Sequence, residues 1–344
     1  MTKVLLTGSS GFIGKHITLQ LLTAGYEVRA SVRSSAKAAE VRAAMVAHLP
    51  SGFDLDSKLS FSELDLESDT GWDAALAGID VLIHSASPFP IASPKDENDL
   101  VRPAVEGTLR ALRAAHSAGV KRVILTSSVA AIYGNDLPAG KTEFDETMWS
   151  DPNHIIGRVP YTKSKTLAEK AAWDYIAAEA PELELTTVNP VLVAGAPLDK
   201  HFGSSVSVVE RMLSGKDPML PDISFSIVDV KDVAAMHVRA ITTDASKGKR
   251  FIASAGSRTF VSMVKTLKKA FPGRRMSTIP APSFVIRFLA LFDAEVKAVL
   301  PTLGKHIPVN ASQAQKVLGI NFIPVETSLV ESANYLIDNG FVKA

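Results

Sequence analysis

Short apolar, β-branched runs alternate with helix-like segments over the first 190 positions of the chain. Six of these runs predict strands, at residues 3–7, 27–32, 59–64, 80–85, 122–127 and 183–188. Between them apolar residues recur every three or four positions, as at Ile13, Ile17 and Leu21, which is typical of helices. Strands that are apolar nearly throughout and alternate with helices indicate a doubly wound parallel sheet of the α/β class.

The spacing changes after Pro190, where Gly, Pro and Ser become frequent. Strands are expected at 225–230 and 250–255, and one of them is expected to rejoin the main sheet. Helices are predicted at 261–270, 283–300, 311–318 and 325–339. The stretch 283–300 carries Arg287, Asp293 and Lys297, so we expect a buried or half-buried helix and not a membrane span. Residues 191–344 thus predict a smaller C-terminal lobe.

The composition and charge of the chain exclude several classes of partner and chemistry. The 344 residues hold 37 Lys and Arg against 36 Asp and Glu, so no charge bias points to nucleic acid or to a membrane surface. The chain has no cysteine, which excludes disulfides, thiol catalysis and thiolate metal sites, and no metal is expected. A strand that begins at about residue 3 leaves no room for a targeting peptide, so a cytoplasmic location is expected.

A glycine trio lies between the first strand and the first helix, at Gly8, Gly11 and Gly14. Without Cβ atoms the backbone can turn tightly and approach a pyrophosphate, and the helix that follows directs its free N–H groups at that anion. A tight turn without a ligand is the alternative. We predict a cofactor-binding segment in a Rossmann-type domain, residues 1–190, that uses Gly8, Ser10, Gly11, Phe12, Ile13 and Gly14.

The second strand ends with Arg33, and Lys37 follows one helical turn later. No Asp or Glu lies between Arg29 and Ala39 to bind a ribose 2′-hydroxyl. Basic groups at this position favour a 2′-phosphate, so NADP(H) is the predicted cofactor. A solvated basic loop is the alternative.

Two further strand ends carry candidate cofactor contacts. Asp65 and Leu66 follow the third strand and are placed to meet the adenine, although a surface turn fits the same residues. The small residues Ser85, Ala86 and Ser87 follow the fourth strand and would let the chain pass close to the cofactor. His84, just before them, is expected to be a packed strand-end histidine.

Tyr161 and Lys165 lie four residues apart at the start of a predicted helix, 161–179, so both side chains project from one face. A nearby ammonium and the positive charge of an oxidised nicotinamide favour the phenolate and are expected to lower the pKa of Tyr161, which suits it to acid–base catalysis on a carbonyl. Ser128 would donate a hydrogen bond to the same oxygen, with Ser127 as its competitor, and Lys165 would also bind the nicotinamide ribose. Lys163 is expected to point away, and an ordinary amphipathic helix is the alternative for the Tyr/Lys pair.

The chain resembles the extended short-chain dehydrogenase/reductase superfamily, in particular the branch of dihydroflavonol 4-reductases, cinnamoyl-CoA reductases and NADPH-dependent methylglyoxal or aldehyde reductases. The similar segments are 7–14, Val32-Arg33, 126–128, 144–149 (FDETMW), 161–173 (YTKSKTLAEKAAW), 188–191 and 228–234. The resemblance implies Ser128, Tyr161 and Lys165 as the catalytic triad. It also implies Pro190 and Val191 beside the nicotinamide, and Ser205 as a contact from the second lobe. Where the family often has a helix asparagine, this chain has Glu106.

The leading prediction is therefore an NADPH-dependent reductase of aldehydes and ketones, with a small carbonyl compound as its partner and residues 191–344 as the main substrate-binding lobe. Two alternatives stay open: a sugar-nucleotide epimerase or dehydratase that retains NAD, and a non-catalytic NADP-sensing protein. A monomer or homodimer is expected. Phe89, Tyr133 and Phe202 are candidates for the substrate pocket, and they can equally be packing residues.

Overall fold

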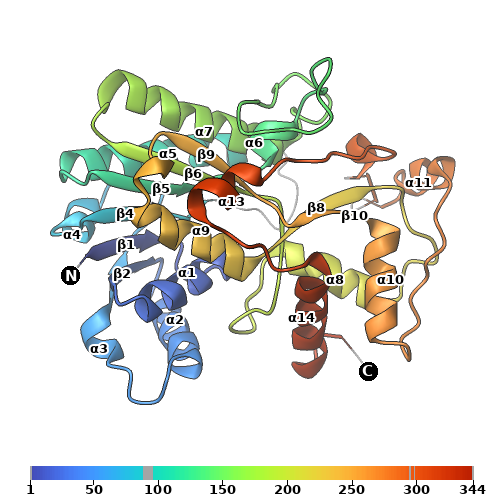
Figure 1. Cartoon of the computed structure of the whole chain (residues 1–344), viewed down its shortest axis with the longest axis horizontal. Helices are drawn as coiled ribbons and strands as arrows, with labels where there is room; N and C mark the ends of the chain where they lie inside the picture. Colours follow the sequence, from blue (N-terminus) through green and yellow to red (C-terminus); the bar gives the residue numbers. More distant parts are fainter. Residues whose placement is uncertain (1, 88–95, 294–295, 298, 343–344) are drawn as a thin grey trace.

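A seven-stranded parallel sheet forms the centre of the molecule in the computed structural model, which describes residues 2–87, 96–293, 296–297 and 299–342 (Figure 1). The strand order is β3-β2-β1-β4-β5-β6-β9, and every pair in it is parallel. The strands are β1 (Lys3–Thr7), β2 (Glu27–Val32), β3 (Leu59–Glu63), β4 (Val81–His84), β5 (Arg122–Thr126), β6 (Glu184–Pro190) and β9 (Lys249–Ala253). The doubly wound parallel sheet predicted from the sequence is confirmed.

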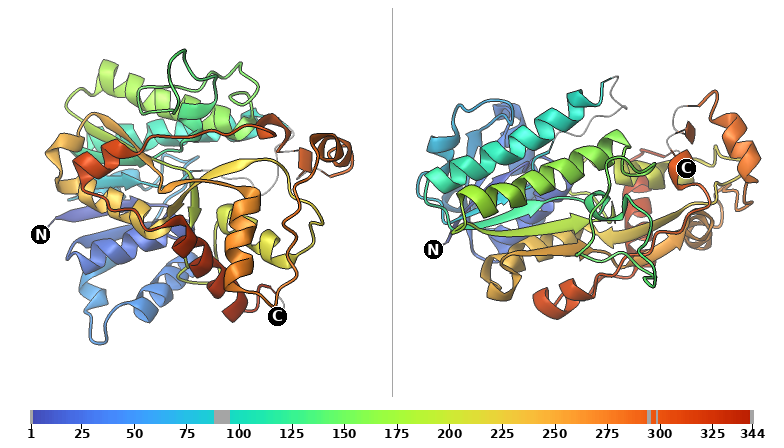
Figure 2. Two further views of the ribbon diagram at one scale, coloured as in Figure 1. Left: turned by 45° about the vertical axis from the view of Figure 1, so that its right-hand side comes forward. Right: turned by 90° about the horizontal axis from the view of Figure 1, so that it is seen from above.

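Helices cover both faces of this sheet because its strands are apolar on both faces. One face carries α5 (Asn98–Ser117) and α7 (Pro160–Glu179), which lie side by side, together with α4 (Trp72–Leu76) (Figure 2). The other face carries α1 (Phe12–Thr23), α2 (Ser35–His48) and α9 (Val230–Thr242). Alternate residues of β1 separate the two cores, since Leu5 belongs to the first and Val4 and Leu6 belong to the second.

The second lobe is built on a small sheet of order β10-β8-β7, formed by β7 (Leu192–Ala194), β8 (Ser224–Asp229) and β10 (Gly256–Thr259). Its helices are α8 (Ser204–Ser214), α10 (Phe260–Ala270), α11 (Ser283–Leu289), α13 (Ser312–Leu318) and α14 (Val325–Asp338). Short elements complete the fold: α3 (Leu55–Lys58), α6 (Ala130–Tyr133), η1 (Asp244–Ser246) and η2 (Leu300–Thr302). Of the two strands expected after residue 190, β9 lies at the edge of the main sheet beside β6, whereas β8 lies in the small sheet.

The prediction of one long helix at 283–300 is wrong. Helix α11 ends at Leu289, and its apolar side chains are largely outside, with Phe284 74% and Phe288 61% exposed. Only Ile286 of this helix is buried, because the helix covers one side of a cavity and meets no packed layer on its other side. Within the part of the chain that the structure describes, no helix combines the length and apolarity needed to cross a membrane.

Candidate active site

A cavity of about 460 Å³ opens at the carboxyl ends of β1 to β4. It brings together nine of the residues that the sequence predicts for cofactor binding: Gly8, Ser10, Gly11, Arg33, Asp65, Leu66, Ser85, Ala86 and Ser87. These residues come from four strand–helix connections, which a parallel sheet places along one edge. The structure therefore gathers the predicted nucleotide-binding residues at one site.

Two of the three glycines, Gly8 and Gly11, line this cavity, and Gly14 packs behind Gly8. Gly8 has a φ of 73°, and a Cβ there would lie 2.7 Å from the backbone nitrogen of Ala86. A Cβ at Gly14 would lie 2.1 Å from the carbonyl oxygen of Gly8. Gly11 caps the N-terminus of α1, whose free N–H groups and positive dipole end suit an anion. Close backbone packing of this kind fits a pyrophosphate cradle, so the residues present fit a dinucleotide cofactor.

Several lining residues were not predicted from the sequence: Thr7, Ser31, Val32, Leu64, Glu67, Trp72, Asp99 and Pro103. Thr7 also fixes the turn after β4, because its hydroxyl accepts the N–H of Ala86 at 3.1 Å and contacts His84 Nδ1 at 2.8 Å. A threonine that ends the first strand beside the glycine trio is a signal that sequence reasoning could have used. Asp99 and Pro103 lie far along the chain on α5 and gave no such signal.

The two basic residues of the predicted phosphate site are placed differently. Arg33 is exposed and lines the cavity. Lys37 does not line it, and its Nζ is 2.7 Å from a carboxylate oxygen of Glu40. Arg33 is therefore the better-placed of the two groups for a 2′-phosphate.

The other predicted cofactor residues do not line this cavity: Phe12, Ile13, Gly14, Lys165, Tyr161, Pro190, Val191 and Ser205. A Cβ at Gly203 would lie 3.7 Å from Phe12, so the start of α8, which carries Ser205, adjoins the glycine segment. Val191 lines a separate cavity of about 100 Å³ with Tyr133, Leu192 and Phe225.

Tyr161, Lys165 and Ser128 come together beside Ser87 of the first cavity, and Val129, which follows Ser128, lines the smaller one. The hydroxyl of Ser128 hydrogen-bonds that of Tyr161. Lys165 Nζ lies 5.8 Å from the centroid of the Tyr161 ring and donates to Ser87 Oγ at 2.8 Å. Ser87 lines the nucleotide cavity, so the ammonium joins the predicted reacting group to the predicted cofactor site.

Three other polar residues considered for the site, Ser127, Lys163 and Glu106, do not point to the Tyr161 hydroxyl. Ser127 Oγ donates to Glu169 at 2.5 Å, away from Tyr161. Lys163 is paired with Glu97 at 2.7 Å, and Glu106 is exposed. The geometry thus selects Ser128 over Ser127, as expected for neighbours that point to opposite sides of a strand end.

Burial shifts the pKa values of the reacting groups in opposite directions. It raises the pKa of Tyr161 above its ordinary value, and the hydrogen bond from Ser128 only partly offsets this. Among the groups of the protein itself, the neighbouring ammonium therefore does not lower the Tyr161 pKa as expected, because desolvation disfavours the phenolate more than its neighbours stabilise it. Burial also lowers the pKa of Lys165 from 10.5 to about 8, against the attraction of Glu169. At neutral pH the site thus holds a phenol that can donate a proton beside an ammonium.

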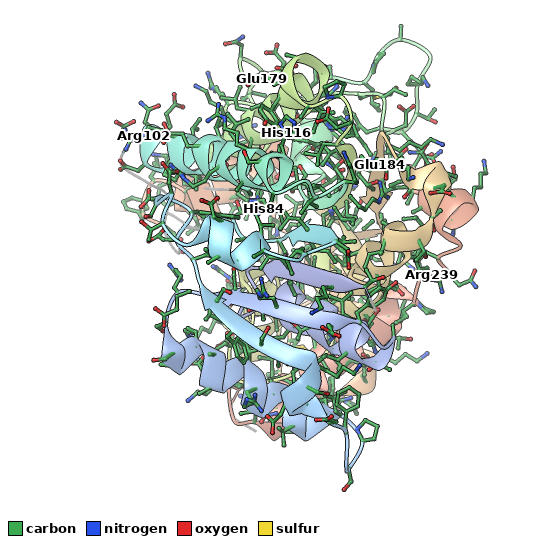
Figure 3. The ribbon with its side chains drawn as sticks, turned by 90° about the vertical axis from the view of Figure 1, so that its left-hand side faces the viewer. His84, Arg102, His116, Glu179, Glu184 and Arg239 are labelled. Carbon is green, nitrogen blue, oxygen red and sulfur yellow. The ribbon has the colours of Figure 1, made fainter. Side chains whose placement is uncertain are left out.

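His84 is buried at the end of β4, beneath α5 (Figure 3). Burial lowers its pKa to about 3, so the imidazole is neutral. This agrees with the packed role expected for it. Phe89, a pocket candidate from the sequence, lies outside the described residues, and Phe202 packs edge-on against Phe341 at a centroid distance of 4.9 Å.

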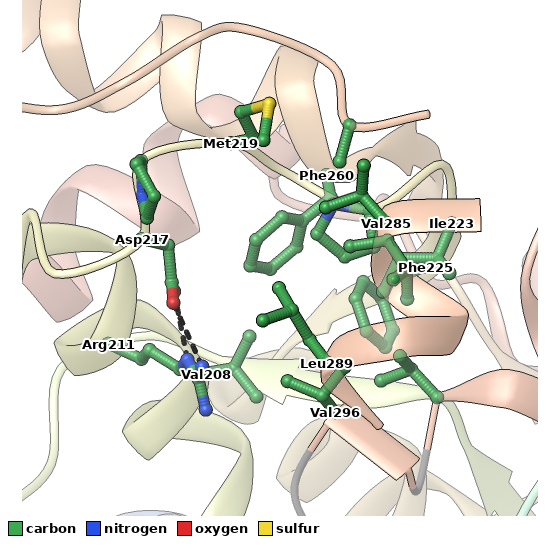
Figure 4. A pocket seen from close by; sticks show the side chains of 15 residues that line it. Val208, Arg211, Asp217, Met219, Ile223, Phe225, Phe260, Val285, Leu289 and Val296 are labelled. Atoms are coloured by element: carbon green, nitrogen blue, oxygen red, sulfur yellow. Dashed lines mark hydrogen bonds and ion pairs between the residues drawn. The ribbon is translucent and has the colours of Figure 1, made fainter. Parts of the chain in front are cut away.

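A third cavity, of about 250 Å³, lies in the second lobe between α8, α10 and α11 (Figure 4). Its walls are almost entirely apolar, and the ion pair of Arg211 with Asp217 lies at one side. Phe225 lines both this cavity and the smaller one beside Tyr133, so the two cavities adjoin at this ring. Among the described residues no group of three or more His, Cys, Asp or Glu side chains is placed to hold a metal ion.

Comparison with known proteins places this geometry in a family. Residues 4–253 match the model of the NAD dependent epimerase/dehydratase family. The chain is 32% identical over 286 residues to an anthocyanidin reductase ((2S)-flavan-3-ol-forming) of Vitis vinifera, covering 79% of this chain and 82% of that one. It is 32% identical over 359 residues to a putative NADPH-dependent methylglyoxal reductase of Candida albicans, covering 98% of both chains. Its structure resembles that of the yeast methylglyoxal/isovaleraldehyde reductase complexed with NADPH, with a TM-score of 0.80, 27% identity, and 99% and 100% of the two chains covered.

The close contact at Gly14 leads to a prediction. Gly14→Ala forces a Cβ to within 2.1 Å of the Gly8 carbonyl, so α1 must shift away from the cradle. We expect the free energy of unfolding to fall by about 1–3 kcal/mol, and NADPH binding, followed by fluorescence titration, to weaken. Gly273→Ala is the matched control, because nothing lies within 4 Å of its Cβ position. Equal NADPH affinity in the two variants would contradict the role of Gly14.

Proposed function

The chain belongs to the NAD dependent epimerase/dehydratase family, and we propose that it is an NADPH-dependent reductase of aldehydes and ketones in which Tyr161 is the proton donor. The observation that carries the proposal is the hydrogen bond between the Tyr161 and Ser128 hydroxyls, beside a Lys165 ammonium that reaches Ser87 in the nucleotide cavity. The relatives named as methylglyoxal and anthocyanidin reductases support carbonyl reduction.

The cofactor would be held by the residues at the carboxyl ends of the strands. The glycine segment of residues 8–14 would bind its pyrophosphate, Arg33 its 2′-phosphate, and Asp65 with Leu66 its adenine; Gly8, Arg33, Asp65 and Leu66 all line the cavity. Pro190 and Val191 would flank the nicotinamide, and Ser205 and Lys37 would add contacts at the edges. When bound, NADPH supplies the hydride that reduces the carbonyl carbon.

The residues of the reacting centre stabilise the negative charge that develops on the carbonyl oxygen. Tyr161 donates its proton to that oxygen, and Ser128 donates a hydrogen bond to it as negative charge develops. Lys165 stabilises the tyrosinate left behind and would hydrogen-bond the nicotinamide ribose. Tyr161 then regains a proton from water before the next turnover.

Two alternatives make different demands on these residues. An epimerase or dehydratase of the same fold retains NAD through its cycle, whereas Arg33 at the 2′-phosphate position and the NADPH-dependent relatives support an exchangeable NADPH. A non-catalytic NADP sensor would not need the Tyr161–Ser128 hydrogen bond. Both observations favour the reductase.

We propose that the second lobe, residues 191–344 apart from β9, selects the substrate. The cavity between Tyr133, Val191 and Phe225 is mostly apolar. Its Tyr133 is close enough to Tyr161 for the two side chains to interact electrostatically, so the cavity lies beside the reacting centre. The carbonyl would lie at Tyr161 and an apolar substituent would extend toward Phe225. The monomeric or dimeric state and the cytoplasmic location stay predictions from the sequence.

Tyr161→Phe removes the proton donor and little volume. We expect turnover with NADPH and an aldehyde panel, followed by the loss of absorbance at 340 nm, to fall by about 10²–10⁴-fold while NADPH binding is retained. The Tyr133→Phe protein, which loses a hydroxyl nearby, is the control and should keep most of its turnover. Near-normal turnover of Tyr161→Phe would contradict the assignment of Tyr161 as the proton donor.

Arg33→Ala should weaken the binding of NADPH by about tenfold or more and that of NADH far less, because only NADPH carries the 2′-phosphate. Lys37→Ala is the comparison, and we expect a smaller loss since the Lys37 ammonium is already paired with Glu40. Fluorescence titration with both cofactors measures the ratio. Equal losses for NADPH and NADH in Arg33→Ala would show that Arg33 does not contact the phosphate.

The pH dependence follows from Lys165. Its lowered pKa of about 8 means that the ammonium is present below that pH and is lost as the pH rises through it. We expect kcat/KM for reduction to be level near neutrality and to decline above about pH 8, while Tyr161, with its raised pKa, stays protonated across this range. Lys165→Arg should lose this decline because a guanidinium stays charged. A wild-type profile level to pH 10 would refute the assignment of the decline to Lys165.

A further inference from the structure

One carboxylate is buried at the junction of the α7 helix with three strand ends. Glu169 is only 1% exposed and lies one helical turn after Lys165. Its oxygens accept hydrogen bonds from Ser127 Oγ (2.5 Å), Asn189 Nδ2 (2.7 Å), Arg250 Nε (2.7 Å), Thr187 Oγ1 (3.1 Å) and Trp173 Nε1 (3.4 Å). Four of the five donors lie on or directly after a strand: Ser127 follows β5, Thr187 and Asn189 lie on β6, and Arg250 lies on β9. A single side chain thus connects the helix of Tyr161 and Lys165 to the strands that it packs against.

Two of the donors are next in sequence to residues of the proposed site. Ser127 precedes Ser128, and Asn189 precedes Pro190. The Asn189 amide donates both to Glu169 and, at 3.1 Å, to the backbone carbonyl of Ser128. Because these bonds share one carboxylate, any shift of Glu169 would move the Ser128 hydroxyl relative to Tyr161.

The positive partner, Arg250, is held from the opposite side. Its Nη1 donates to the carbonyls of Glu146 and Met148 at 2.8 and 2.6 Å, and its guanidinium stacks 3.7 Å from the centroid of the Trp149 ring. The Glu146 carboxylate in turn accepts the N–H of Ile252 on β9 at 3.1 Å. The segment 144–149 (FDETMW), to which the proposed function assigns no role, therefore packs against the Glu169–Arg250 ion pair.

We propose that Glu169 is a positioning residue of the reductase: its carboxylate fixes Ser128 and the Asn189–Pro190 segment against α7 and supplies the negative charge that faces the Lys165 ammonium. The inference rests on the proposed function, since Ser128 and Lys165 act in it. The geometry points to this role more directly than to simple structural support, because Glu169 shares its helix face with Lys165.

The charge part of the role depends on what else faces Lys165. The titratable groups around it are Tyr161 and Glu169 on α7 and His84 on β4, and Tyr133 on α6 lies beside Tyr161. His84 and Tyr133 are neutral, since burial lowers the pKa of the first to about 3 and raises that of the second to about 12. From α5, Arg102 and Glu106 are exposed. Glu169 is thus the anion that acts on Lys165 among the described residues.

Two variants separate charge from geometry. Glu169→Gln keeps the shape and removes the charge, so the decline of kcat/KM near pH 8 should move down by about one pH unit. Glu169→Asp keeps the charge and withdraws the carboxylate by one methylene, so the decline should stay in place while kcat falls by about tenfold or more. The dissociation constant of NADPH, from fluorescence titration, should change by less than about threefold in both. Acetylation of Lys165 as a function of pH in the free protein, read by mass spectrometry, reports its pKa without turnover and should shift with Glu169→Gln.

Lys163→Gln is the matched control, because it removes a charge from the same helix at a side chain that pairs with Glu97. It should leave the pH profile unchanged. Loosening of the core by Glu169→Gln would instead hydrate Lys165 and move its pKa upward, toward 10.5. An upward or absent shift in Glu169→Gln, or unchanged kcat in Glu169→Asp, would overturn the proposal.

A variant that does not fold is recognised by circular dichroism and replaced by Ser127→Ala, which deletes the 2.5 Å contact and leaves the ion pair intact. Its kcat should fall severalfold at unchanged NADPH affinity, and an unchanged kcat would overturn the proposal. Tyr161→Phe is assayed beside these proteins. Loss of turnover in Tyr161→Phe with normal Glu169 variants rejects only the positioning role, whereas full turnover in Tyr161→Phe rejects the proposed function itself.

Discussion

The parallel sheet imposes the constraint on which the rest of this structure depends. Its strands all end at one edge, and both of its faces must be covered by helices because both are apolar. Several connections that leave that edge start with a small or polar residue, as at Gly8 after β1, Ser85 after β4 and Ser127 after β5. The cofactor cavity is lined largely by residues of these connections, where the chain leaves the packed strands.

Burial at this edge desolvates charged groups, which is unfavourable, and the chain offsets this by pairing the buried polar groups with one another. Desolvation raises the pKa of Tyr161 and lowers that of Lys165, so it opposes the separation of charge between them. The Glu169–Arg250 pair behind them is also buried, and such a pair is stable only when its remaining hydrogen-bonding groups are satisfied. Glu169 meets this condition with donors from strands and helix, and Arg250 meets most of it with two backbone carbonyls and an aromatic ring.

Much of the fold and part of the site could be predicted from the sequence because their signals are local. The six early strands are short apolar runs with clear ends, and they occur where expected, with shifts of one or two residues. The glycine spacing likewise reflects contacts between residues only a few positions apart, as at Gly8 and Gly14. The 283–300 stretch misled for a related reason: its apolar residues have helical spacing, but periodicity does not reveal whether a packing partner exists.

The remainder required contacts between distant residues. Glu169 and Arg250 are 81 positions apart, and neither has a neighbour in sequence that marks it as buried. Read locally, Glu169 is one more charged residue on an amphipathic helix, and the alternating charges around it suggest a solvated face. Only the three-dimensional arrangement shows that this turn of α7 faces the ends of β5, β6 and β9, where an unpaired carboxylate would not be tolerated. A charge that is kept in such a place, one turn from Lys165, has to be explained by what it holds in position, and its hydrogen bonds lead directly to Ser127 and Asn189 beside the reacting centre.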